Sequence, residues 1–398
     1  MAVDSSASTP GPSASGSGSG DPTVIDSGVA TTTPDVTVPD PSEGAAGATS
    51  DASIDASNNR TDASLTTGPF PFRPPFILGA DITWTLEDEA SGATHSDGVS
   101  VKPLEEIMAN NGFNYIRLRT FVNPSAAGGY SRQGFGDTAH TITMAKRVKR
   151  CGMGLFLDFH MSDTWASIGA QIMPSAWTGM TPTQMQTAAH DYVKGVLDQM
   201  VAAGVEPDMV QVGNETNSSM SGVPMSNWAD FSGLVNAGIR AVRETDPRII
   251  VWAQHGRPRP DGNFEPWVDK YLSGTPAPKI DEDGICGSTY GTTANGTDWQ
   301  QQFQYVIRKY NKPVMSCEYT DLAPDAPGGA LINGVMHGFA NGMGYGSFIW
   351  EPTRYPSVNG AGTLFSKTGN TYTTNAAMAD YPKLAKSYGL PVPASVCH

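Results

Sequence analysis

From residue 76 onward, the sequence alternates between short apolar runs typical of β-strands and longer stretches typical of helices. Strands that alternate with helices pair in parallel through crossover connections, so this alternation strongly constrains the fold. The strand-like runs number eight and lie at 76–82, 115–121, 153–159, 209–212, 248–253, 285–290, 313–317 and 345–350. The helix-like stretches lie at 101–111, 138–150, 181–203, 226–245, 263–273, 298–310, 328–341 and 376–388.

Eight such units in about 323 residues fit the usual size of a (β/α)8 barrel, the TIM-barrel form of the α/β class. The sequence therefore predicts one barrel domain over residues 76–398. A doubly wound open sheet is the alternative, although no glycine-rich phosphate-binding loop follows the first predicted strand.

The predicted helices carry boundary signals of their own. Thr181, followed by Pro182 and by Gln184, is typical of an N-cap with a capping box, and Gly204 is placed to end that helix. Ser226 is expected to cap the next helix.

Residues 1–75 differ from the rest in composition. The first 69 residues contain no aromatic residue, Cys or Lys, and Ser, Thr, Gly, Ala, Pro and Asp dominate them. Such a segment cannot bury enough apolar surface to offset the entropy lost on ordering, so we expect a disordered linker. Nine acidic residues against Arg60 and Arg73 give it half of the chain's net charge of −14. The barrel is then only mildly acidic, which argues against a nucleic-acid partner.

The chain lacks the sequence signals of membrane insertion. No apolar run approaches the roughly 18 residues needed to span a bilayer. The start Met-Ala-Val-Asp-Ser-Ser has neither the basic residues nor the apolar stretch of a secretory signal. The four cysteines show no CxxC spacing, so a zinc site is not expected. Free thiols and one or two disulfides are both open for Cys151, Cys286, Cys317 and Cys397.

In a (β/α)8 barrel the active site lies at the C-terminal ends of the strands. Polar and aromatic residues gather at these ends here, whereas the starts of the predicted strands have few residues suited to binding or catalysis. In chain order they are Asp81, Arg117, Arg119, Asp158, His160, Asn214, Glu215, Gln254, His255, Tyr290, Glu318, Trp350 and Glu351. This distribution indicates a functional site rather than a rim that serves stability.

Glu215 and Glu318 end the fourth and seventh predicted strands, so we expect them on opposite sides of the barrel, facing each other. Glycosidic bond cleavage needs two such groups: one protonates the leaving oxygen, and the other attacks the anomeric carbon or activates water. Asn214 is placed to bond a sugar 2-hydroxyl. Arg117 or Arg119 is placed to keep the nucleophile ionised, because a nearby cation lowers a carboxylate's pKa. A structural ion pair is the alternative for both arginines.

Four sequence blocks carry a specific resemblance to a known family. Gly79–Ile82, Tyr115–Arg119, Leu157–Ala166 and Pro207–Glu215 resemble glycoside hydrolase family 53, the endo-β-1,4-galactanases. The resemblance covers most of the predicted barrel. It implies a retaining enzyme that cuts internal β-1,4-galactan linkages, with Glu215 as the acid/base and Glu318 as the nucleophile. The two carboxyl groups should then lie about 5 to 5.5 Å apart.

The remaining substrate-binding candidates are Asp81, Asp158, His160, Trp165, Tyr290 and Trp350. His160 should face the barrel mouth, with a buried core histidine as the alternative. Trp165 and Trp350 would stack on sugar rings, although Trp165 has core packing as its alternative. Tyr290 would donate a hydrogen bond to the nucleophile or pack in the core. We expect more structural roles for three further residues, Asp163, His255 and Glu351.

One stretch departs from the family pattern. Residues 288–296 read STYGTTANG, where family members usually carry an aromatic-rich run. This difference does not affect the predicted reaction type. It weakens the prediction of which sugars bind on either side of the cleaved bond. An endo-β-glycanase for mannan or a β-glucan and a barrel that only binds glycans are therefore alternatives. A barrel enzyme that acts on phosphorylated substrates would need a glycine-rich loop after the seventh or eighth strand. The few glycines at 328–329 and 342–344 are not enough to form one.

The resemblance also sets the expected partners. The partner is a polysaccharide, and no cofactor is expected. Calcium occurs in some relatives, but no compact Asp/Asn loop indicates it here. We expect a monomer, secreted because a polysaccharide cannot reach a cytoplasmic enzyme.

Overall fold

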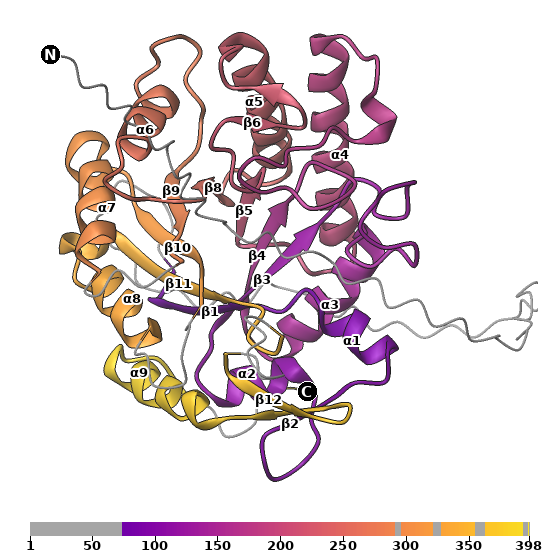
Figure 1. The fold of residues 1–398 in the computed structure, drawn as a ribbon, viewed down its shortest axis with the longest axis vertical. Coiled ribbons are helices and arrows are strands. Elements are labelled where there is room, and N and C mark those ends of the chain that lie inside the picture. Colours follow the sequence, from indigo (N-terminus) through magenta and orange to yellow (C-terminus); the bar gives the residue numbers. More distant parts are fainter. Residues whose placement is uncertain (1–73, 291–295, 321–327, 355–362, 393–396, 398) are drawn as a thin grey trace, which may run out of the picture. The chain divides into compact units, whose positions relative to one another are not determined.

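The computed structural model describes residues 74–290, 296–320, 328–354, 363–392 and 397. All but the last two residues of the expected linker at 1–75 lie outside this range, so its disorder stays a prediction. The described residues form a closed barrel of strands with helices around it (Figure 1).

Eight parallel strands close the barrel, which confirms the predicted (β/α)8 fold. Around the ring their order is β1, β11, β10, β9, β8, β5, β4 and β3. They are β1 (Ile77–Asp81), β3 (Tyr115–Thr120), β4 (Gly154–Phe159), β5 (Met209–Val212), β8 (Ile250–His255), β9 (Gly284–Ser288), β10 (Val314–Tyr319) and β11 (Gly344–Trp350). The predicted sixth strand was too long: β9 ends at Ser288, because its last pairing to β10 joins Ser288 to Glu318.

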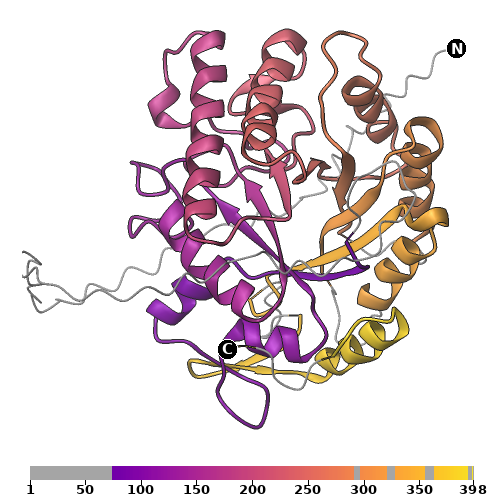
Figure 2. The same ribbon diagram turned by 180° about the vertical axis from the view of Figure 1, so that it is seen from behind.

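The helices stand outside the strands in both views (Figures 1 and 2). They are α2 (Leu104–Asn110), α3 (Thr138–Arg150), α4 (Pro182–Ala202), α5 (Trp228–Thr245), α6 (Phe264–Leu272), α7 (Thr297–Tyr310), α8 (Gly328–His337) and α9 (Tyr381–Ser387). Each crossover connection buries an apolar helix face against the barrel, which is why helix and strand periods alternate along the chain.

The signals predicted around α4 are present. The Thr181 side chain accepts a hydrogen bond from the Gln184 backbone, the Gln184 side chain returns one, and Gly204 follows the helix end with φ +71°. The prediction that Ser226 caps α5 was wrong. The Asn227 N–H donates to the Pro224 carbonyl at 3.0 Å in a turn, so the helix begins one residue later.

Several short elements had escaped the sequence analysis. They are α1 (Thr85–Ala90), β2 (Thr94–Ser96), the hairpin of β6 (Ser219–Met220) and β7 (Val223–Pro224), β12 (Phe365–Thr368) and β13 (Thr371–Thr374). The predicted helix at 376–388 is in fact a 3-10 turn over Ala376–Asp380 followed by α9. Strand β13 pairs with β2 across more than 270 residues, a partnership that no local pattern reveals.

Two disulfides settle the question left open for the cysteines. One joins Cys151, at the end of α3, to Cys397 near the C-terminus. The other joins Cys286 on β9 to Cys317 on β10, inside the barrel wall. Because Cys317 immediately precedes Glu318, the second disulfide ties the strand that carries this carboxylate to its neighbour.

Candidate active site

The two candidate carboxylates lie at the same end of the barrel. Glu318 is on β10, and Glu215 follows the end of β5 by three residues. Strands β8 and β9 lie between β5 and β10 in the ring, so the two glutamates are three strands apart. This corrects the expectation that they stand on opposite sides. Both are nearly buried, at 8% and 6% exposed.

A chain of hydrogen bonds across the two intervening strands connects Glu215 to Glu318. The Ser288 hydroxyl donates to Glu215 Oε1 at 2.6 Å. The Gln254 side-chain amide donates to the Ser288 hydroxyl and to Glu318 Oε1, each at 3.0 Å. Ser288 was not among the predicted site residues, although it is the first residue of the stretch that departs from the family pattern. Gln254 was noted only as a polar residue at a strand end.

Glu215 sits where its neutral form is favoured. Burial raises the pKa of Glu215 to about 7, and the negative charge of Glu318 acts in the same direction. Its backbone lies in the left-handed region, with φ 47°, and Gln254 Oε1 accepts its N–H at 3.2 Å. A non-glycine residue in this region is strained, and such strain gathers at functional sites. The site thus holds a carboxyl group that can carry a proton near neutral pH.

Glu318 sits among hydrogen-bond donors. The Arg117 guanidinium lies 2.9 Å from Glu318 Oε1, and the Tyr290 hydroxyl donates to Oε2 at 2.7 Å. The hydrogen bond predicted for Tyr290 is therefore present. Both oxygens of Glu318 meet donors, which is the environment an anionic carboxylate needs. Glu215 also accepts a hydrogen bond on each oxygen, from the Ser288 hydroxyl and the Ile168 N–H, but of the two glutamates Glu318 is the one in direct contact with the guanidinium of Arg117.

Arg117 is the central cation of the site. It is fully buried and also contacts Asp81 at 3.0 Å, Asp158 at 2.8 Å and the Asn214 side-chain oxygen at 3.0 Å. Burial alone would raise the pKa of Asp158, but the charge of Arg117 and its neighbour His160 hold it below the ordinary value. Two alternatives were predicted for Arg117, a structural ion pair and a contact with the nucleophile. The structure has both contacts.

Arg119 makes different contacts. It pairs with Asp81 at 2.9 Å and Glu351 at 2.5 Å, and no contact joins it to Glu318. Its guanidinium also lies 4.9 to 5.5 Å from the ring centres of three indoles, those of Trp84, Trp165 and Trp350. All three indoles are only partly buried. Arg119 thus holds an aromatic cluster in place, and Trp84 is a member that sequence reasoning missed.

The remaining predicted residues have mainly positioning contacts. His160 is 1% exposed, accepts the Ala166 N–H on Nδ1 at 3.0 Å and lies 3.1 Å from Asp158, on the same side of the strand as this inward-facing carboxylate. It is thus buried, as the alternative had it, and its contact with substrate stays a prediction. The loop that carries Trp165 folds over it. Asp163 accepts hydrogen bonds from the Asn123 and Ser175 backbones and therefore shapes that loop, as expected.

Asn214 keeps part of its hydrogen-bonding capacity. Its side-chain amide donates to the Ala166 carbonyl at 2.7 Å, and its oxygen accepts from Arg117. An amide nitrogen carries two hydrogens, and among the described residues only the Ala166 carbonyl accepts one of them, which leaves the other N–H for a ligand. Contact with a sugar 2-hydroxyl therefore stays a prediction.

A model of glycosyl hydrolase family 53 matches residues 77–326 of this chain. This match covers more than half of the chain and spans the strands that carry both glutamates. The chain belongs to glycosyl hydrolase family 53. It is accordingly a glycoside hydrolase, which fits a site built around two connected carboxyl groups.

Individual family 53 relatives are similar over most of the barrel. An endo-β-1,4-galactanase of Bacillus subtilis is 31% identical over 313 residues, which cover 71% of each chain. Among solved structures, a fungal β-1,4-galactanase matches with a TM-score of 0.68 and 21% identity over 77% of this chain and 99% of that one. The family 53 catalytic domain of Ignisphaera aggregans matches with a TM-score of 0.67 and 22% identity over 80% and 99%. The structural matches support the barrel fold.

Two further features concern ions and membranes. Across the described ranges, no group of three or more His, Cys, Asp or Glu side chains is arranged to hold a metal ion. No helix in the described part of the chain is long and apolar enough to cross a membrane.

Proposed function

We propose that the chain hydrolyses internal β-1,4-galactosidic linkages of galactan or type I arabinogalactan with retention of configuration. The reaction type rests on one observation: Glu215 and Glu318 share a connected site in which burial raises the pKa of Glu215 to about 7, whereas Glu318 contacts the guanidinium of Arg117. The substrate class is supported by the 31% identical relative, which is named an endo-β-1,4-galactanase.

In the first step Glu318 acts as the nucleophile. One of its oxygens forms a bond to the anomeric carbon while the bond from that carbon to the leaving oxygen breaks. Glu215 gives its proton to the leaving oxygen, so the shortened chain departs as a neutral alcohol. Arg117 and Tyr290 orient Glu318 through the contacts at 2.9 and 2.7 Å. The product of this step is a covalent glycosyl–enzyme ester.

In the second step Glu215 acts as a base. It takes a proton from water, whose oxygen attacks the anomeric carbon and releases Glu318 as a carboxylate. Glu215 has then regained its proton and the cycle is complete. Two inversions at one carbon give net retention, and this geometry requires the carboxyl groups to lie about 5 to 5.5 Å apart, a spacing that stays a prediction.

The other site residues support substrate binding in this proposal. The indoles of Trp84, Trp165 and Trp350, gathered around Arg119, supply apolar faces on which sugar rings stack. Asn214 uses its free N–H for the 2-hydroxyl. Asp81, Asp158 and His160 hold the arginines and loops in place rather than touching sugar.

Activity should fall as pH rises through the pKa of Glu215. The first step needs the protonated acid, and a pKa raised to about 7 keeps that proton bound to higher pH than in an ordinary glutamate. We expect kcat/KM on galactan to lose about tenfold for each pH unit well above 7. Measurement of kcat/KM from pH 4 to 9 checks this. An alkaline limb centred near pH 5 would contradict the raised pKa.

The substrate assignment can be tested with a panel of pure polysaccharides. The expected result is that β-1,4-galactan is cut to a ladder of short oligosaccharides, because an endo-acting enzyme attacks internal bonds. Mannan and mixed β-glucans should stay intact. Product sizing by chromatography gives the answer, and turnover of mannan without turnover of galactan would overturn the proposal.

Localisation and assembly follow from the same proposal. A polymer of this size cannot enter a cell, so we propose that the enzyme acts outside it. We propose that the barrel acts as a monomer and needs no cofactor, because each proposed chemical step is assigned to side chains of this one chain. In this proposal residues 1–75 serve as a linker to the catalytic domain at 76–398.

A further inference from the structure

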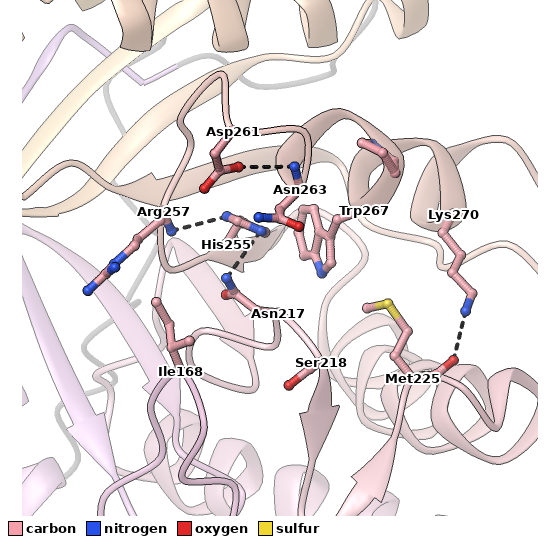
Figure 3. A pocket seen from close by; sticks show the side chains of 11 residues that line it. Ile168, Asn217, Ser218, Met225, His255, Arg257, Asp261, Asn263, Trp267 and Lys270 are labelled. Carbon is pink, nitrogen blue, oxygen red and sulfur yellow. Dashed lines mark hydrogen bonds between the residues drawn. The ribbon is translucent and has the colours of Figure 1, made fainter. Parts of the chain in front are cut away.

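A pocket of about 490 Å³ has Ile168, Asn217 and His255 in its lining (Figure 3). It follows β5 and β8 and borders α6, whereas the indoles around Arg119 follow β1, β4 and β11. Its volume is within the range of small-molecule sites. Its polar and charged lining residues are Asn217, Ser218, His255, Arg257, Asp261, Asn263 and Lys270.

The pocket is next to Glu215, although Glu215 does not line it. Ile168 forms part of the pocket wall, and its N–H donates to Glu215 Oε2 at 3.1 Å. The backbone of Gly256 closes the same corner, since a Cβ on it would lie 2.9 Å from the carboxyl carbon of Glu215. In the proposed mechanism Glu215 protonates the leaving oxygen. The pocket is therefore on the side of the leaving group, the part of the substrate toward the reducing end.

The pocket lining presents little aromatic surface on which a sugar ring could stack. Trp267 is 4% exposed, and its N–H is committed to the Thr216 carbonyl at 3.0 Å. His255 and Asn217 form the pocket floor with their side chains 3.1 Å apart (Figure 3). Burial lowers the pKa of His255 to about 4, so the ring is neutral at the pH of assay. Recognition here depends on polar and charged groups.

Charge in the pocket is of opposite sign to that of the whole protein. The lining carries two cations, Arg257 and Lys270, against the single carboxylate of Asp261, in a chain with a net charge of −14. Lys270 is already engaged, since its ammonium donates to the Met225 carbonyl at 2.8 Å and lies over Trp228. Asp261 accepts the Asn263 N–H at 3.0 Å.

Arg257 is the cation left for a ligand. It is exposed, and among the described residues no hydrogen-bond or ion-pair partner contacts its guanidinium, since its one hydrogen bond there is made by the backbone N–H. Its side chain extends away from Asn217 and His255 on the side of Ile168, the residue that contacts Glu215 (Figure 3). A guanidinium binds a carboxylate through two parallel hydrogen bonds, which no neutral hydroxyl reproduces.

We propose that this pocket binds a sugar unit that carries a carboxylate, held by Arg257, on the leaving-group side of the cleaved bond. The inference rests on the proposed function, because the mechanism is what places the leaving group beside Glu215. The enzyme would then favour galactan chains with an acidic unit toward the reducing end over uniformly neutral ones.

A matched pair of oligosaccharides tests this proposal. A β-1,4-galacto-oligosaccharide is oxidised at its reducing end to the aldonate, and the same compound is reduced to the neutral alditol. Wild-type enzyme should cleave the aldonate with kcat/KM about threefold to fivefold higher, the range of a partly exposed ion pair. In Arg257→Gln the ratio should fall to about one, and added salt should lower it in the wild type.

Arg240→Gln is the matched control, because Arg240 is an exposed arginine on α5 remote from the pocket. It makes the same change in net charge and should keep the aldonate preference. Equal kcat/KM for the pair in the wild type, or a preference that survives Arg257→Gln, would overturn the pocket assignment. If neither compound is cut, the proposed function is wrong instead. Calorimetric titration with galactonate, comparing wild type with Arg257→Gln, then decides the pocket separately.

Discussion

Glu318→Ala should lower the rate of galactan hydrolysis by on the order of 10⁴-fold or more, because the reaction loses the group that forms the covalent intermediate. Arg117 keeps its contacts with Asp81 and Asp158 in this variant, so the barrel should stay folded. Reducing-sugar release measures the rate, and thermal melting checks the fold. Glu244→Ala, at an exposed position on α5, serves as a control that should retain full activity.

Azide sharpens the assignment of Glu318. In Glu318→Ala, an azide ion fits the space left by the carboxylate and attacks the anomeric carbon from the same face. Glu215 still protonates the leaving oxygen, so the expected product is an α-glycosyl azide of inverted configuration. Nuclear magnetic resonance identifies the anomer. Wild-type activity in Glu318→Ala, or a β-azide product, would show that this residue is not the nucleophile.

Glu215→Gln should lower galactan hydrolysis by roughly 10²- to 10⁴-fold, the usual contribution of a general acid. The loss should depend on the leaving group. Dinitrophenolate departs without a proton, so the first step with dinitrophenyl β-galactobioside should be nearly as fast as in the wild type. The second step still lacks its base, so the glycosyl–enzyme should accumulate and KM should fall.

Two measurements check the role of Glu215. Stopped-flow release of dinitrophenolate should show a burst in Glu215→Gln, and azide should restore turnover in Glu215→Ala with a β-glycosyl azide as product. The alkaline fall in kcat/KM should also disappear from the variant, because the group whose pKa burial raises to about 7 is gone. An equal loss of rate on galactan and on the dinitrophenyl substrate would contradict the acid/base role.

The barrel could be predicted from the sequence because its evidence is local. Each strand needs only a short apolar run, and each helix carries its own period and end signals, as Thr181 and Gln184 show for α4. Glu215 and Glu318 could be picked out for a related reason. Once the strands are counted, a barrel brings all of their C-terminal ends together. The expected site could therefore be located from the barrel topology and from the acidic residues at the strand ends.

The rest depends on contacts between distant residues. Trp84 belongs to the site because Arg119, on another strand, holds it beside Trp165 and Trp350, and no pattern around residue 84 signals this. Ser288 bonds Glu215 across 73 residues for the same kind of reason. Strand parity placed His160 on the same side as Asp158, but it could not indicate that the loop carrying Ala166 covers the ring.

The proposed mechanism requires a covalent bond between the substrate and Glu318, and mass spectrometry can observe this bond directly. A dinitrophenyl galactobioside with fluorine in place of the 2-hydroxyl reacts in the first step but is released slowly, so the glycosyl–enzyme should persist. We predict that intact protein gains the mass of one fluorinated disaccharide and that digestion places it on the peptide containing Glu318. Failure of the enzyme to gain this mass while still hydrolysing galactan, or a label on any other residue, would contradict the account.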